Sequence, residues 1–152
     1  MKKLFLIFVL FLLPAIANPL SLVRPATLKF QLIAVVVDWC PYCNKWAEEV
    51  VPLYDDIIPL VIVNITSEQG MPEWYKKAYY TGRIEQLYSI PAFIIWDTEA
   101  KTELVRWTGY GGVDHFYQML DKAINKAIEK QVLCSDTSAL ERHRVCKAEK
   151  IG

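Results

Sequence analysis

Two cysteines separated by two residues, Cys40 and Cys43, are the side chains of this 152-residue chain best suited to do chemistry. An apolar run ends just before them and helical spacing begins with them, so the first sulfur is expected at a helix N-terminus. The helix dipole favours a thiolate there. A thiolate attacks a disulfide to form a mixed disulfide, which a second thiol one turn away can resolve. The spacing predicts a redox pair with Cys40 as nucleophile and Cys43 as resolving thiol.

Zinc sites use the same cysteine spacing, but they need two further thiolate or imidazole ligands at suitable spacing. The other thiols and imidazoles of the sequence are Cys134, Cys146, His115 and His143. They do not form a second short ligand pair. We therefore expect no metal and no cofactor.

Cys134 and Cys146 form a second pair, separated by eleven residues. Exported proteins commonly join such pairs as structural disulfides, and this is the interpretation we prefer. A second redox relay is the alternative. Titration of free thiols under mild reductant separates the two, because equal ease of reduction of both pairs would argue against a purely structural bond.

The elements that must position Cys40 are a buried strand before it and an amphipathic helix after it. Residues 28–37 end in an unbroken apolar run, typical of a strand buried on both faces. Apolar residues at helical spacing follow the cysteines, and Pro52 predicts a kink or an early end of that helix. Residues 59–65 are interpreted as a second buried strand. This order favours a parallel pair with a right-handed crossover.

The residues further along predict the rest of an α/β fold. Residues 66–89 are polar and aromatic, and suggest one or two short helices. Residues 91–96 and 103–107 are interpreted as two strands of an antiparallel hairpin. Glycines then precede an amphipathic helix over residues 113–130.

The N-terminal segment has the features that signal peptidase recognises. Lys2 and Lys3 precede an apolar run over residues 4–13, and small residues follow. The run is about half the ~20 residues that a membrane-spanning helix needs. We therefore expect a signal peptide that is cleaved after Ala17, and a periplasmic protein.

Three segments are expected: the signal peptide over residues 1–17, one domain over 18–131, and a C-terminal tail over 132–152. Ser138 and Glu141 have the spacing of a capping box, which predicts a short helix in the tail. Without Lys2 and Lys3, 15 basic side chains remain against 17 acidic ones. This charge balance gives no positive electrostatic field that would attract a polyanion, so nucleic acid is not an expected partner. A monomer is expected.

Two motifs, WCPYC at residues 39–43 and SIPAF at residues 89–93, lie on either side of the second predicted strand. Together they resemble the thioredoxin superfamily, and the similarity spans about residues 28–130. The resemblance implies an α/β fold whose central mixed sheet of about four to five strands is flanked by helices. It also implies a cis peptide bond before Pro91, close to Cys40. The substrate groove would then be lined by Trp39, Pro41, Tyr42, Ile90 and Pro91.

Two features depart from typical thioredoxins. The Pro-Tyr dipeptide between the cysteines is the one found in glutaredoxins, although the export signal and the longer chain argue against that family. Ala34 stands where thioredoxins carry a buried aspartate. Asp38 is the nearest carboxylate to Cys40 in sequence. It is either an acid–base participant or, as we prefer, a solvated or capping group.

The resemblance implies an exported thiol:disulfide oxidoreductase that acts on protein disulfides, with electrons returned by a membrane thiol transporter. The chain is similar to exported bacterial thioredoxin-like proteins, including those associated with sulfur oxidation and cytochrome maturation. Dedicated oxidases of the superfamily carry a helical insertion before the cis-proline, whereas only 26 residues lie between Asn64 and Pro91. This favours a reductase over a dithiol oxidase. A binding or chaperone module without turnover is the alternative from another class.

Overall fold

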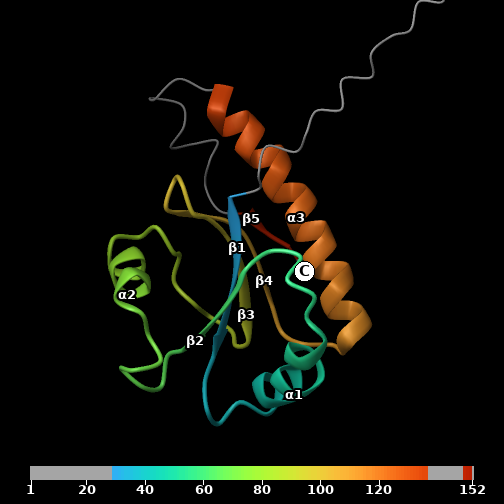
Figure 1. Cartoon of the computed structure of the whole chain (residues 1–152). Helices are drawn as coiled ribbons and strands as arrows, with labels where there is room; N and C mark the ends of the chain where they lie inside the picture. The colour runs from blue at the N-terminus through green and yellow to red at the C-terminus, as the bar shows by residue number, and fades with distance from the viewer. Residues whose placement is uncertain (1–28, 137–148, 152) are drawn as a thin grey trace, which may run out of the picture.

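The computed structural model describes residues 29–136 and 149–151, and shows a mixed sheet with helices on both faces (Figure 1). The predicted α/β architecture is confirmed. Across the sheet the strand order is β2-β1-β3-β4-β5. The strands are β1 (Phe30–Val36), β2 (Leu60–Asn64), β3 (Ala92–Asp97), β4 (Thr102–Thr108) and β5 (Glu149–Lys150). The helices are α1 (Pro41–Glu49), α2 (Glu73–Tyr80) and α3 (Val113–Asp136), with a 3₁₀ turn, η1 (Val51–Leu53), after α1.

The central strand is β1, which pairs with β2 in parallel and with β3 in antiparallel orientation. Val35, for example, lies opposite Val63 on one side and Ala92 on the other. The β3 and β4 strands form the predicted antiparallel hairpin. The strand predicted over residues 59–65 also exists, but it lies at the sheet edge and Ile62 is 43% exposed. The expected burial of this strand was therefore wrong. An apolar run in the sequence does not distinguish an edge strand from a central one.

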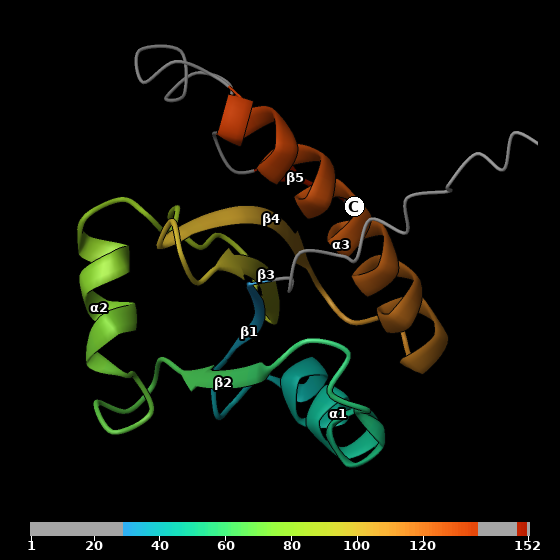
Figure 2. The same cartoon turned by 45° about the horizontal axis from the view of Figure 1, so that its top comes forward.

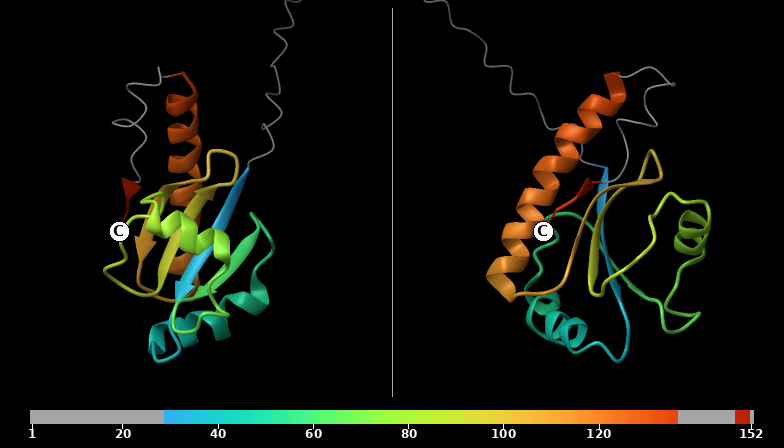
Figure 3. Two further views of the ribbon diagram at one scale, coloured as in Figure 1. Left: turned by 90° about the vertical axis from the view of Figure 1, so that its left-hand side faces the viewer. Right: turned by 180° about the vertical axis from the view of Figure 1, so that it is seen from behind.

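Side chains of β1 alternate between two apolar layers, as the pleat of a strand requires. Leu32 and Ala34 face α1 and α3, while Ile33 and Val35 face α2. Figures 2 and 3 show α1 and α3 on one side of the sheet and α2 on the other. The α1–α3 side contains a cluster of stacked and tilted rings: Trp46, Phe93, Trp107 and Phe116.

Two helix ends test the predictions made from sequence. The α1 helix stops at Glu49 and Pro52 lies in η1, as the missing amide of proline predicts. The α3 helix continues to Asp136, past the predicted end at residue 130. Its polar end is anchored to the sheet, because Gln131 Nε2 donates to Asp97 Oδ2 at 3.3 Å. An apolar stripe does not reveal such polar anchors.

The capping box of the predicted tail helix, Ser138 and Glu141, lies outside the described residues. Within the described ranges, no helix combines the length and apolar character that crossing a bilayer requires.

Candidate active site

Cys40 lies where β1 has ended and α1 begins. Its amide donates to the Val37 carbonyl at 3.2 Å, which closes the turn between strand and helix. Pro41 is the first helical residue, a position that suits proline because an amide there would have no partner within the helix. The amides of Cys43 and Asn44 both lie 3.1 Å from the Cys40 carbonyl. Cys40 is therefore the N-cap of α1, in agreement with the expected helix start.

The Cys40 sulfur accepts a hydrogen bond from the Cys43 amide at 3.1 Å. A donor aimed at sulfur stabilises a thiolate more than a thiol, in the same direction as the helix dipole. A disulfide joins the two cysteines, whose Cα atoms lie 5.2 Å apart. After reduction, this amide and the α1 N-terminus are in place to favour ionisation of Cys40.

Access to the two cysteines is unequal. Cys40 retains 8% of its surface and Cys43 only 2%. Both pack with Val37 into a small apolar cluster against which Ile65 and Ile90 also lie. Cys40 is therefore the more accessible of the two sulfurs, while the roles of nucleophile and resolving thiol stay predictions.

A second stretch of chain approaches the cysteines through Ile90, which packs against their cluster. The peptide bond between Ile90 and Pro91 is cis, the configuration that the resemblance implies. The Pro91 carbonyl accepts a hydrogen bond from the Gly109 amide at 2.8 Å. The fold thus brings residues 90–91 beside the WCPYC motif, although the sequence separates them widely.

The other predicted groove residues lie on the surface next to the cysteines. Trp39 is 75% exposed and Tyr42 is 62% exposed, and Pro41 is also exposed. Tyr88, which the sequence analysis did not single out, is 78% exposed shortly before Ile90. Large exposed aromatic side chains are common at sites of protein contact.

Asp38 is exposed and takes part in a local hydrogen-bond network. Its carboxylate accepts from Thr66 Oγ1 at 2.6 Å and from Asn64 Nδ2. These two hydrogen bonds, that from Thr66 first, lower the pKa of Asp38 below its ordinary value. They tie the turn before Cys40 to the chain that follows β2. A role in proton transfer remains a prediction, because these bonds also give the carboxylate a structural function.

Ala34 is fully buried between Ile62 and Phe93 of the neighbouring strands. No carboxylate therefore occupies the position that holds the buried aspartate in typical thioredoxins.

Tyr110 links the glycine segment after β4 to the last residue of α1, a contact that the sequence analysis missed. Its hydroxyl donates to Glu49 Oε2 at 2.6 Å, and the side chain is 8% exposed. Burial, followed by the hydrogen bond and charge of Glu49, raises the pKa of Tyr110 to about 12. This contact holds the segment that follows Gly109 against the helix that carries the cysteines.

A buried ion pair between Glu103 and Arg106 was also missed. The available signal was the presence of two opposite charges in a strand that was predicted to pair with an apolar one.

The described residues do not include Cys146 or the side chain of Cys134. The pairing of these two cysteines stays a prediction.

A family model for the thioredoxin-like domain matches residues 21–124. The chain belongs to this family, and with a joined Cys-x-x-Cys pair at the start of α1 it is a thiol:disulfide oxidoreductase. Among solved structures, it is similar to the periplasmic thioredoxin SoxS from Paracoccus pantotrophus in its reduced form. The two are 23% identical, with a TM-score of 0.49, over 64% of this chain and 98% of that chain. A comparison with curated proteins finds no match.

Proposed function

We propose that this oxidoreductase reduces or exchanges disulfides in exported protein substrates, with Cys40 as the attacking thiol. The observation that carries the proposal is the asymmetry of the pair. Cys40 caps α1 and is the more accessible sulfur, whereas Cys43 is almost fully buried one turn behind it. This arrangement suits a nucleophile with its own resolving partner.

The proposed cycle begins with the reduced pair. The Cys40 thiolate attacks one sulfur of the substrate disulfide, forms a mixed disulfide and releases the other substrate sulfur as a thiolate, which takes up a proton. The Cys43 thiol then loses its proton and attacks the Cys40 sulfur. This step forms the Cys40–Cys43 disulfide and releases the second substrate thiol. The substrate gains two electrons and two protons, and a dithiol of a membrane thiol transporter would reduce the pair again.

The direction of exchange is proposed to be reductive. The connection between β2 and β3 contains α2 as its only helix, and α2 has eight residues. The large helical insertion expected of a dedicated oxidase would have to lie in this connection. Purified protein should therefore reduce insulin in the presence of dithiothreitol. Negligible reduction of insulin with rapid oxidation of dithiol peptides would instead identify an oxidase.

Trapping distinguishes an exchange enzyme from a binding or chaperone module. Cys43→Ser retains the attacking thiol and should accumulate mixed disulfides with its substrates, which mass spectrometry can identify. The matched Cys40→Ser variant keeps one thiol in the same motif and should trap substrate only weakly. Equal recovery of non-covalent partners by both variants, with no mixed disulfide, would support the binding module.

Export to the periplasm is proposed from the lysines and the apolar run at the N-terminus. N-terminal sequencing of secreted protein should find Asn18 as the first residue. A chain that still begins at Met1 would contradict a cleaved signal peptide. We also propose a monomer, which light scattering of the purified protein would check.

A further inference from the structure

The chain between α2 and β3 delivers Ile90 and Pro91 to the cysteines. In the structure, residues 81–91 form neither helix nor strand. Part of this segment is nevertheless buried, since Ile84 is 1% exposed and Leu87 packs against the apolar layer on the α2 side. Backbone amides and carbonyls near a core need hydrogen-bond partners. The position of this segment therefore depends on what its backbone groups contact.

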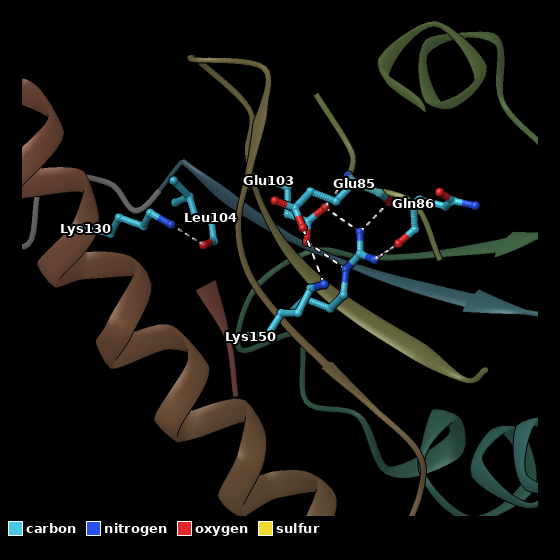
Figure 4. A network of polar contacts seen from close by, with 7 residues as sticks. Glu85, Gln86, Glu103, Leu104, Lys130 and Lys150 are labelled. Carbon is cyan, nitrogen blue, oxygen red and sulfur yellow. Dashed lines mark hydrogen bonds and ion pairs between the residues drawn. The ribbon is translucent and has the colours of Figure 1, made fainter. Parts of the chain in front are cut away.

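Glu103 and Arg106 of β4 provide those contacts. Figure 4 shows Glu103 beside Glu85, with Gln86 next in the segment. The Glu85 amide donates to Glu103 Oε2 at 3.0 Å. Arg106 donates in turn to two carbonyls, from Nη2 to Glu85 at 2.8 Å and from Nη1 to Gln86 at 2.9 Å. The Glu103 amide adds a hydrogen bond to the Arg83 carbonyl at 3.1 Å. Two residues of one strand thus hold four backbone groups of the segment.

A β-bulge explains how both side chains reach the same segment. Residues three apart in a regular strand point to opposite faces of the sheet. Here Ile95 pairs with Val105 and Trp96 with Glu103, so Leu104 is an extra residue without a partner on β3. The extra residue brings Glu103 and Arg106 to one face. The Leu104 carbonyl accepts instead from Lys130 Nζ of α3 at 3.0 Å.

The ion pair is buried, and two hydrogen bonds join its side chains. Glu103 and Arg106 are 2% and 3% exposed, and Arg106 Nε and Nη2 each donate to one carboxylate oxygen, at 2.7 and 2.6 Å. The attraction within a buried pair is offset by the cost of removing both charges from water. The pair is thus weak evidence for stability. The planar guanidinium of Arg106, with two hydrogen bonds to the carboxylate, nevertheless fixes how the two side chains are oriented. The guanidinium nitrogens that bond the two carbonyls are held in place by the carboxylate.

We propose that Arg106 and Glu103 are positioning residues that hold residues 85–91 in a fixed position beside Cys40. Only Leu87, Tyr88 and Ser89 separate the anchored Gln86 from Ile90. A shift of the anchored backbone would therefore move Ile90 and Tyr88 relative to the attacking sulfur. The inference rests on the proposed exchange at Cys40, because it concerns the surface that a protein disulfide would contact.

Lys150 of β5 contacts the same segment from the outside. Its Nζ lies 3.6 Å from Glu85 Oε2 and 5.4 Å from the ring centre of Tyr88. The Lys150 side chain is 56% exposed, and surface contacts of this kind contribute little. The buried pair is accordingly the main anchor. A substitution of Lys150 should therefore affect the segment less than a substitution of Arg106.

Arg106→Lys tests the proposal. Lysine keeps the charge opposite Glu103, but its single nitrogen cannot bond the carboxylate and both carbonyls in the same geometry. We expect the KM for insulin to rise roughly tenfold, the effect of losing about one net hydrogen bond, with kcat changed less than about twofold. The rate of Cys40 alkylation by iodoacetamide and the reduction of hydroxyethyl disulfide should stay at wild-type values. Lys150→Gln should raise the KM for insulin less than Arg106→Lys does.

Leu120→Ala is the control for a general loss of stability. Leu120 is buried on the opposite face of the sheet, so its truncation destabilises the fold without a contact to residues 85–91. A KM for insulin that rises equally in Leu120→Ala and Arg106→Lys would overturn the proposal, as would an unchanged KM in a folded Arg106→Lys variant. If Arg106→Lys does not fold, Glu103→Gln keeps the shape of the side chain, and the same two outcomes decide. Wild-type protein that reduces neither insulin nor hydroxyethyl disulfide would instead refute the proposed function.

Discussion

Two stretches of chain meet at the cysteines, and they are held in different ways. The turn over residues 37–40 is held mainly by its own backbone and by the helix that it starts, with Asp38 also bonded to Asn64 and Thr66. Residues 81–91 are held by side chains that reach in from β4, a strand that comes later in the sequence. The first stretch carries the reacting sulfur, whereas the second carries Ile90 and Pro91 beside it.

The difference separates chemistry from recognition. Ionisation of the Cys40 thiol depends on local contacts: the α1 N-terminus and the Cys43 amide at 3.1 Å. The surface beside it depends on a long-range anchor at Glu103 and Arg106. Damage to the anchor should therefore weaken substrate contact while the thiol remains reactive. Damage to the turn should lower the reactivity of the thiol and leave the substrate-contact surface in place.

The largest effect is expected from Cys40→Ser, which removes the chemistry of the first stretch. Serine is a far weaker nucleophile than a thiolate, so the kcat/KM for insulin reduction should fall by at least about a thousandfold. The unfolding free energy of the reduced variant should stay within about 1 kcal/mol of reduced wild type, because the side chains are similar in size. A turbidity assay of insulin reduction measures kcat/KM, and denaturant unfolding measures the free energy of unfolding. Retained activity would remove Cys40 from the mechanism.

Sequence alone sufficed for the first stretch because its signals are local. An apolar run predicted β1, and the helical spacing that begins at the cysteines predicted the start of α1. The resemblance implied the cis bond before Pro91 in the second stretch, but the anchor was not predictable, since it requires the bulge at Leu104 to bring Glu103 and Arg106 to one face. A bulge depends on how two strands align, which no short pattern in the sequence specifies.

The next largest effect is expected from breaking the anchor completely. Arg106→Leu leaves Glu103 as an unpaired buried charge and should reduce the unfolding free energy by about 3–5 kcal/mol. The double variant Glu103→Leu with Arg106→Leu removes both charges and should regain much of this stability. Its KM for insulin should nevertheless stay high, because Glu85 and Gln86 remain without their partners. A double variant with a wild-type KM would show that the second stretch positions itself.

A smaller effect is expected at Tyr110, which joins the segment after β4 to α1. Tyr110→Phe should cost about 1 kcal/mol of unfolding free energy, because the Glu49 carboxylate loses one hydrogen bond. In the folded protein the pKa of Tyr110 should be about 12, against 10.0 for a free tyrosine. Stability from this group is thus full below the unfolded pKa and is lost as the pH rises toward the folded one. Phenolate absorbance should lose the step near pH 12 in Tyr110→Phe, and a titration unchanged by the substitution would contradict this assignment.

The smallest effect concerns Asp38, whose side-chain hydrogen bonds tie the first stretch to the chain at the end of β2. Hydrogen bonds from Thr66 and Asn64 place the folded pKa of Asp38 below 3.8, so the stabilising contribution is present above that value and is lost as the pH falls through the folded pKa. Thr66→Val removes the larger cause and should bring the pKa of Asp38 closer to 3.8, as carboxyl NMR titration would detect. Insulin reduction at neutral pH should hardly change, because Asp38 is ionised there in both proteins. A marked loss of activity in Asp38→Asn, with Thr66→Val unaffected, would favour proton transfer by Asp38 over a structural role.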